Sequence, residues 1–321
     1  MSCPSRRCRP RRTSLMYKKF FGLQESPFNV NPDPRYLFLT EQTQEALSVL
    51  TYGIQNRKGF ILLSGEVGTG KTTLINKLLE WLHREAVATS LLFNSRLNVT
   101  QFFDFVMADF GLKCESRLKS QVLLRLNHWL LERYRAGETA VLIIDEAQNL
   151  SLQLLEEIRL LTNLETATEK LLQIVLSGQP ELELKLKQPE LRQLRQRITL
   201  RCKTLPLTLE EARGYITRRL SIAGADSLPV FTPEAVEAVH KYSHGIPRVI
   251  NLLCEHALIS AFADQQRPVP ADTIETVARE FELHEIESAA PPALLTSGES
   301  LRVVETLQNL ATLMDRLRRP E

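Results

Sequence analysis

Residues 60–73 read Phe-Ile-Leu-Leu-Ser-Gly-Glu-Val-Gly-Thr-Gly-Lys-Thr-Thr. The first part, residues 60–64, is a short apolar run of the kind that forms a buried strand. The second part, residues 65–72, fits the pattern G-x-x-x-x-G-K-[ST] at every position. Residues 72–84 then place leucines at helical spacing. The stretch therefore predicts a strand, a glycine-rich loop and a helix, in that order.

The chemistry of this loop follows from its residue types. Glycines let the backbone curl until successive N–H groups point at one phosphate, and the following helix adds the positive end of its dipole. We expect Lys71 to reach the β- and γ-phosphates and the Thr72 hydroxyl to ligate Mg²⁺. The loop thus predicts ATP and Mg²⁺ as ligands, in preference to a glycine-rich turn without a ligand. The expected binding residues are Gly65, Glu66, Val67, Gly68, Thr69, Gly70, Lys71, Thr72 and Thr73.

An acidic pair closes an expected strand that is apolar throughout. Residues 140–146 read Ala-Val-Leu-Ile-Ile-Asp-Glu. Two acids at the end of a buried strand are costly unless they emerge beside the phosphates and their cation. We expect Asp145 to bind Mg²⁺ together with Thr72, and Glu146 to orient and activate the attacking water. The alternative is an exposed Asp-Glu pair at the start of a helix.

Strands and helices alternate around these two motifs. We expect strands at residues 60–64, 91–94, 140–145, 171–176 and 198–202. Helices are expected at residues 40–55, 72–84, 100–110, 118–134, 152–164 and 189–196. Such alternation predicts an α/β fold with a mostly parallel sheet and right-handed crossovers. Beyond Pro206 the pattern becomes helical, at residues 208–223, 233–240, 246–263 and 271–285.

Three further polar residues lie where the expected elements end. Gln179 follows the fourth strand and is our candidate to sense the γ-phosphate, with Ser177 as the alternative. Arg197, preferred to Arg195, is a candidate to reach into a neighbouring subunit and neutralise transition-state charge. Arg248 begins a helix behind Pro247 and is a candidate γ-phosphate ligand. The alternative is an ordinary polar turn for Gln179 and a surface arginine for Arg197 and Arg248, and from the residues alone the surface position is favoured for Arg197.

The composition is that of a globular protein without a membrane helix. The chain has 321 residues, of which 43% are apolar and 24% charged. No apolar run approaches the roughly 18 residues that a membrane helix needs, and no signal peptide is visible. Of the five cysteines, Cys3 and Cys8 lie in the first fifteen residues. The others form no C-x-x-C pair and are expected to be reduced, mostly buried thiols: Cys114, Cys202 and Cys254. We therefore expect a cytoplasmic location.

The net charge of +2 depends on the first fifteen residues. They contain five arginines and no acid, so the remaining chain carries 2 − 5 = −3. This segment has no periodicity and predicts a disordered tail, with Met16 as the expected true start. The alternative is a basic arm that binds nucleic acid.

These patterns predict five regions. The first is the basic tail 1–15, and the second an α/β ATPase domain 16–205. A helical lid 206–286 follows, then a linker 287–300. The last is a C-terminal amphipathic helix 301–321 with a heptad-like apolar repeat.

Taken together, the motifs resemble the AAA+ superfamily, and within it the ExeA/GspA-like secretion ATPases. The resemblance rests on residues 20–35, 65–73, 142–150, 177–182, 194–198 and 245–251. It implies a three-layer P-loop sandwich whose five-stranded parallel sheet has the order 5-1-4-3-2, followed by the helical lid. It also implies ATP hydrolysis, assembly into a ring or filament of hexamer type, and service to envelope machinery such as type II secretion, type IV-like pili or exopolysaccharide export.

Larger members of that family continue through a membrane helix into a peptidoglycan-binding region, and this sequence contains neither. We therefore expect a short form that reaches the envelope through a protein partner, peripherally at the inner membrane. A second hypothesis is a DNA-associated regulator of transposition, with a basic stripe formed by Lys185, Lys187, Arg192 and Arg195. The charge of −3 disfavours it, since DNA affinity rests largely on phosphate neutralisation. A third is a nucleotide-gated scaffold with negligible turnover.

Overall fold

The computed structural model describes residues 13–29, 34–93, 97–113, 118–225 and 228–283. All of them belong to one compact unit, residues 1–284. The expected linker and C-terminal helix lie outside the described residues, as do most of the basic tail and the thiols Cys3, Cys8 and Cys114.

A parallel sheet of five strands forms the centre of the α/β part. The strands are β1 (Phe60–Gly65), β2 (Ala88–Leu92), β3 (Ala140–Ile144), β4 (Leu172–Gly178) and β5 (Leu200–Thr204). Their order is β2-β3-β4-β1-β5 and every pairing is parallel. This is the predicted order 5-1-4-3-2 read from the opposite edge, so the predicted fold class is confirmed.

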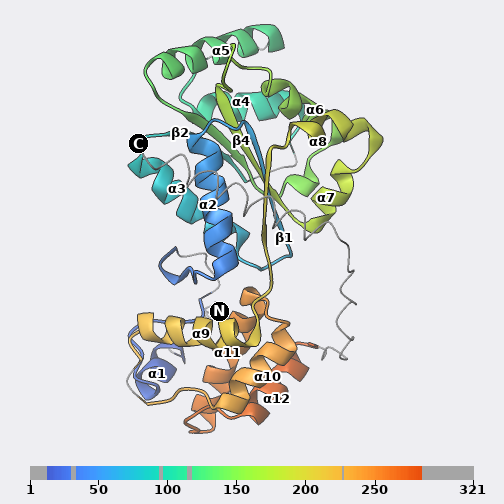
Figure 1. Cartoon of the computed structure of the whole chain (residues 1–321). Helices are drawn as coiled ribbons and strands as arrows, with labels where there is room; N and C mark the ends of the chain where they lie inside the picture. The colour runs from blue at the N-terminus through green and yellow to red at the C-terminus, as the bar shows by residue number, and fades with distance from the viewer. Residues whose placement is uncertain (1–12, 30–33, 94–96, 114–117, 226–227, 284–321) are drawn as a thin grey trace, which may run out of the picture. The chain divides into compact units, whose positions relative to one another are not determined.

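Helices cover both faces of the sheet (Figure 1). Successive residues of a strand point to opposite faces of the sheet. In β3, Val141 packs with α2 (Glu41–Gln55) and α3 (Lys71–Arg84). The next residue, Leu142, packs against the helices of the other face. That layer is formed by α4 (Val99–Asp109), α5 (Lys119–Arg135), α6 (Leu152–Leu161), α7 (Pro180–Leu186) and α8 (Arg192–Arg197). The parallel arrangement brings the carboxyl ends of all strands to one edge, where the glycine-rich loop, Asp145 and Gln179 lie.

Beyond β5 the described part of the chain is helical, as predicted. It contains α9 (Leu209–Ile222), α10 (Pro233–Ser243), α11 (Pro247–Ala263) and α12 (Ala271–Glu280). Thr208 and Thr232 act as N-caps, and Pro233 occupies the first position of α10. Within the described ranges, no helix combines the length and apolar character that a bilayer crossing requires.

The N-terminal segment packs against these helices and not against the sheet. Tyr17, Phe21 and Phe28 share one buried cluster with α9, α10, α11 and α12. Its first part forms α1 (Thr13–Phe20), so residues 13–15 of the segment that we predicted to be disordered are helical. A short 3-10 turn, η1 (Pro34–Tyr36), follows. These aromatic side chains anchor the segment to the helical part of the chain.

Several predicted elements differ from the structure, and helices α6 and α12 end earlier than predicted, at Leu161 and Glu280. Strand β2 begins at Ala88, three residues before the predicted strand. It pairs with β3 along its whole length, and only its end is strongly apolar, so the apolar pattern showed only that end. Strand β5 begins at Leu200 and not at Ile198, because α8 extends to Arg197. Helix α7 was not predicted at all; Pro180 at its first helical position was the available signal.

Candidate functional site

The glycine-rich loop is shaped for close approach by a ligand. Gly68 and Gly70 have φ values of +81° and +97°, which residues with a Cβ rarely adopt. Gly70 is the N-cap of α3 and supplies no side-chain cap, so the first N–H groups of that helix have no cap from it. A Cβ built on Gly70 would meet no atom within 4 Å. The loop thus presents N–H groups and a helix dipole to open space, which suits an anion.

Lys71 is buried at the base of the loop and is 5% exposed. Its Nζ donates to the carbonyl oxygens of Gly65 at 2.7 Å and Glu66 at 2.8 Å. Burial lowers the pKa of Lys71, while Glu146 and Asp145 act in the opposite direction. The ammonium is therefore held inside the loop by uncharged carbonyl acceptors, and a phosphate there would stabilise its charge.

Asp145 receives three hydrogen bonds at the end of β3. Its Oδ2 accepts from the Thr72 hydroxyl at 3.2 Å, and its Oδ1 accepts from the Ser177 hydroxyl at 2.7 Å and from the Glu146 backbone N–H at 3.0 Å. Thr72 lies in the first turn of α3, Ser177 lies on β4 and Asp145 follows β3, so three elements meet at one carboxylate. A hydroxyl and a carboxylate are the hard oxygen donors that Mg²⁺ prefers.

The residues present fit Mg²⁺ bound jointly with a nucleotide. Among the described residues, no group of three or more His, Cys, Asp or Glu side chains is arranged to hold a metal ion. Mg²⁺ typically takes only one or two protein ligands and completes its shell with phosphate and water. Thr72 and Asp145 match this coordination preference, since together they supply two protein ligands.

Glu146 lies next to Asp145 in a left-handed conformation, with φ +53°. Its Oε2 accepts hydrogen bonds from the side-chain amide of Gln179, at 3.1 Å, and from that of Gln148. Gln179 is the N-cap residue of α7, at the end of β4. The structure thus places the predicted sensor beside the predicted water-activating acid.

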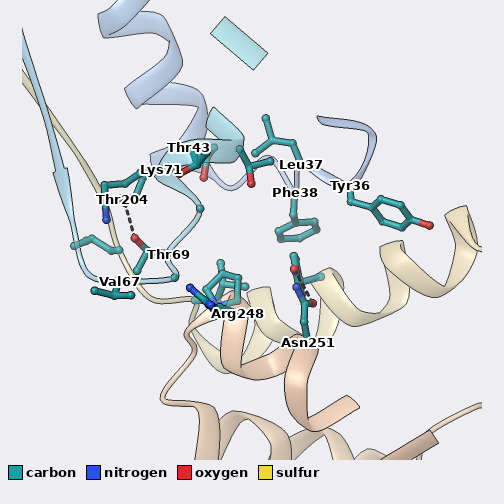
Figure 2. Close-up of a pocket in the computed structure, with 18 of the residues that line it drawn as sticks. Tyr36, Leu37, Phe38, Thr43, Val67, Thr69, Lys71, Thr204, Arg248 and Asn251 are labelled. Carbon is teal, nitrogen blue, oxygen red and sulfur yellow. Dashed lines mark hydrogen bonds between the residues drawn. The ribbon is translucent and has the colours of Figure 1, made fainter. Parts of the chain in front are cut away.

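A cavity of about 350 Å³ lies over the loop. Loop residues 67–73 and Glu146 line one part of it, and Pro247, Arg248 and Asn251 of α11 line another. Figure 2 shows Lys71, Phe38 and Arg248 around this space. The backbone N–H of Arg248 donates to the Gly68 carbonyl at 3.2 Å, which ties α11 to the loop. Arg248 therefore lies where we predicted it.

The sequence reasoning missed the residues at the far end of this cavity. They come from the N-terminal segment and from α9: Tyr36, Leu37, Phe38, Tyr215 and Arg219. The Arg219 guanidinium, 5% exposed, donates to the Pro27 carbonyl at 2.5 Å and lies 4.4 Å from the Tyr36 ring centroid. The aromatic character of residues 36–38 was the only signal in the sequence.

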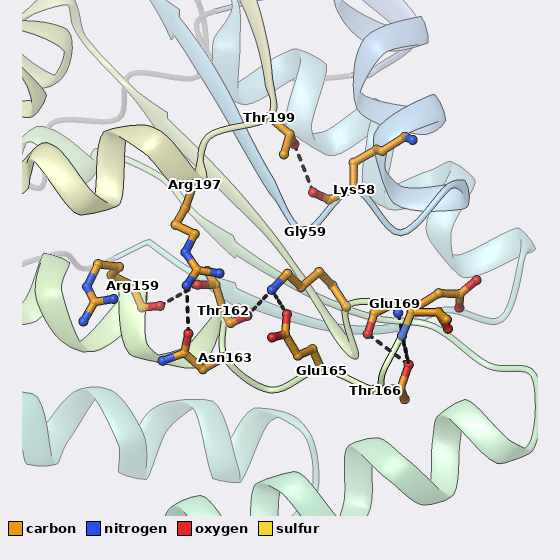
Figure 3. A network of polar contacts seen from close by, with 12 residues as sticks. Lys58, Gly59, Arg159, Thr162, Asn163, Glu165, Thr166, Glu169, Arg197 and Thr199 are labelled. Atoms are coloured by element: carbon orange, nitrogen blue, oxygen red, sulfur yellow. Dashed lines mark hydrogen bonds and ion pairs between the residues drawn. The ribbon is translucent and has the colours of Figure 1, made fainter.

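Arg197 does not line the cavity of its own chain. Its Nη2 donates to Asn163 at 3.3 Å, in a network with the end of α6 (Figure 3). The alternative candidate, Arg195, is exposed on α8. Neither arginine can therefore act on a nucleotide in this cavity from within the same chain.

Lys185 is not available to the basic stripe that the second hypothesis requires. The Lys185 ammonium donates to the carbonyl oxygens of Gln148, at 3.0 Å, and Leu150. Burial lowers the pKa of Lys185. Lys187, Arg192 and Arg195 remain exposed.

Comparison with known proteins agrees with this geometry. The model of the AAA domain family matches residues 54–186. The chain is 47% identical over 249 residues to General secretion pathway protein A of Aeromonas hydrophila. That match covers 77% of this chain and 45% of the relative, so the chain spans less than half of the relative's length.

Solved structures share the fold at low sequence identity. The ORC2 protein of Aeropyrum pernix, in ADPNP-ADP complexes, is 16% identical with a TM-score of 0.58, over 79% of this chain and 71% of that one. Cdc6p of Pyrobaculum aerophilum is 17% identical with a TM-score of 0.61, over 79% and 70%. The RuvB branch migration motor of Thermotoga maritima is 16% identical with a TM-score of 0.52, over 76% and 70%. The chain therefore has the P-loop AAA+ fold, carries an AAA domain, and is a relative of General secretion pathway protein A.

Proposed function

We propose that this chain binds ATP with Mg²⁺ and hydrolyses it, and that this turnover energises or organises the assembly of envelope machinery. The observation that carries the proposal is the hydrogen bond between Thr72 and Asp145, which joins the phosphate-binding loop to the acidic end of β3. A loop that suits phosphate and an acid that suits Mg²⁺ thus lie at one place. The domain division is part of the proposal, with an ATPase domain at residues 16–205 and a lid at 206–286.

Each site residue has a proposed role in this reaction. Lys71 binds the β- and γ-phosphates, and Thr72 with Asp145 holds Mg²⁺, which when bound neutralises phosphate charge. Glu146 takes the proton of the attacking water, and Gln179 beside it senses the γ-phosphate. The remaining loop residues supply N–H groups and hydroxyls to the phosphates.

Two arginines complete the proposed site from outside the loop. Arg248 lines the cavity next to Gly68 and contacts the γ-phosphate from the lid. Arg197 lies away from its own cavity, and we propose that it serves a neighbouring copy. This assignment requires self-association into a ring or filament, with a hexamer as the expected form.

The envelope role rests on the relative's name. General secretion pathway protein A is a secretion protein by name, and the identity supports a related task in type II secretion, a type IV-like pilus or exopolysaccharide export. We propose a cytoplasmic protein that reaches the inner membrane through a partner. We do not propose the DNA-associated alternative, because Lys185 of the basic stripe is engaged with backbone carbonyls and the chain beyond residue 15 carries a net charge of 2 − 5 = −3.

The proposal is tested with the full chain and the Lys71→Ala variant. Wild-type protein should bind ATP and release phosphate only when Mg²⁺ is present, and Lys71→Ala should lose ATP affinity. Lys77→Ala is the matched control, because Lys77 lies on the same helix and pairs with Glu80 on the surface. Equal ATP affinity of Lys71→Ala and the control would refute the assigned site. A deletion strain complemented with either variant would then test the envelope role through secretion or pilus assembly.

A further inference from the structure

The side-chain amide of Gln148 is held at both ends beside Glu146. Its Oε1 accepts a hydrogen bond from the Gln179 backbone N–H at 3.1 Å, and its Nε2 donates to Glu146 Oε2. A backbone N–H can only donate, so it fixes which end of the amide is the oxygen. The NH₂ group must then face the carboxylate, which can only accept when ionised.

The backbone of Gln148 is anchored as well. Lys185 of α7 donates to its carbonyl oxygen at 3.0 Å. On the other side Gly178 leaves little room, since a Cβ there would lie 2.9 Å from Gln148 Oε1. Gln148 therefore has one well-defined position, set by the end of β4 and by α7.

This arrangement constrains one oxygen of Glu146 and leaves the other available. Oε2 accepts from the amides of both Gln148 and Gln179. Among the described residues, no hydrogen bond to Oε1 is found. A general base needs an oxygen within reach of its water and a carboxylate held at a fixed angle.

We propose that Gln148 is a positioning residue that orients the Glu146 carboxylate for water activation, with Oε2 held by amides and Oε1 directed to the water. This rests on the proposed ATP hydrolysis. Gln148 itself touches no reacting atom, so its loss should lower kcat and leave nucleotide binding intact. Because it acts through Glu146, its effect should vanish when Glu146 can no longer act as a base.

Two substitutions of Gln148 distinguish its hydrogen bond to Glu146 from its hydrogen bond to the Gln179 N–H. Gln148→Met removes both hydrogen bonds. Gln148→Glu has nearly the same shape and keeps the acceptor for the Gln179 N–H, but it replaces the donor facing Glu146 by an oxygen of like charge. Gln153→Met and Gln153→Glu are the controls, since Gln153 is exposed on α6.

The measurements are kcat and KM for ATP, and affinity for a non-hydrolysable ATP analogue with Mg²⁺, on the full chain. Both Gln148 variants should lose about 10-fold or more in kcat, since small misplacements of a catalytic group have effects of this order. Analogue affinity should stay within about 2-fold, because no phosphate contact is removed. In a Glu146→Gln background, Gln148→Met should lower kcat no further. If Gln148 had only a structural role, its effect on kcat would add to the loss that Glu146→Gln causes.

Three results would overturn the inference. They are wild-type kcat in Gln148→Glu, a parallel loss of analogue affinity, and an additional loss in the double variant. If the wild type hydrolyses no ATP, or if Glu146→Gln retains full turnover, the proposed function fails instead. If Glu146→Gln abolishes turnover and Gln148→Glu does not lower it, only the role of Gln148 is wrong.

Discussion

The hydroxyl of Thr72 lies 3.2 Å from Asp145 Oδ2, although the two residues are 73 positions apart in the chain. Thr72 belongs to the first turn of α3, and Asp145 follows the last residue of β3. Neither motif alone defines a metal site, because one supplies a hydroxyl and the other a carboxylate. Their proximity is what makes the pair suitable for Mg²⁺.

Ser177 orients the carboxylate of Asp145, so its removal should weaken Mg²⁺ binding. Ser177→Ala deletes the 2.7 Å hydrogen bond to Oδ1 and leaves Thr72 and Asp145 in place. The Mg²⁺ concentration for half-maximal ATP turnover should rise about 10-fold, which is typical when a partner of a metal ligand is lost. Ser221→Ala, at an exposed site on α9, should leave the Mg²⁺ titration unchanged. An unchanged titration for Ser177→Ala would show that Asp145 does not depend on this contact.

The buried Lys71 should make ATP affinity sensitive to alkaline pH. Burial lowers the pKa of Lys71 below its ordinary value of 10.5, so the ammonium loses its proton earlier than an exposed lysine does. ATP affinity should therefore fall on the alkaline side before pH 10.5. In Lys71→Arg, whose guanidinium stays charged, this pH dependence should disappear even if the affinity itself is lower.

The protonation of Lys71 affects ATP affinity and the free energy of unfolding in opposite directions, so the two effects can be distinguished. Between the lowered folded pKa and the ordinary unfolded pKa, the unfolded state binds more protons at Lys71. The contribution of Lys71 to the free energy of unfolding therefore rises with pH in this window, and it is lost as pH falls through the folded pKa. Circular dichroism in parallel with the ATP titrations would check that the fold persists. ATP affinity in the wild type that stays constant up to pH 10.5 would contradict the buried environment of Lys71.

The position of Arg197 predicts complementation between two inactive variants. Arg197→Ala should bind ATP and turn it over poorly, because the arginine serves a neighbouring copy. Lys71→Ala cannot bind ATP but still presents its Arg197. Mixing the two should restore part of the turnover. Arg201→Ala, which changes an exposed arginine on β5, serves as the charge control. Mixtures that show only the sum of the separate activities would argue against a shared site.

The sequence predicted the parts of the site that depend on local chain order. The loop of residues 65–72 has its function because a strand precedes it and a helix follows it, and all three features are visible within 25 residues, 60–84. The position of Asp145 followed from one further rule, that parallel strands end at one edge. Gln179, which follows β4, lies at the same edge of the sheet, as this rule predicts.

The far end of the cavity depends on packing that no local pattern encodes. Arg219 meets Pro27 across 192 positions, and Tyr36 stacks beneath it. The sequence shows neither that residues 17–28 pack against α9–α12 nor that the turn at Tyr36 then faces the loop. Strand β2 was misplaced for a related reason, since its pairing with β3 outweighs the weak apolar pattern of its first residues.

The most direct test of the account is a comparison of ATP binding and ATP turnover in Glu146→Gln. Glutamine preserves the shape and most hydrogen-bonding capacity of the side chain but cannot accept the proton of the water. We expect wild-type affinity for ATP with Mg²⁺ and a loss of turnover on the order of 100-fold or more. Turnover near the wild-type rate would contradict the central claim that the acid next to Asp145 activates the attacking water.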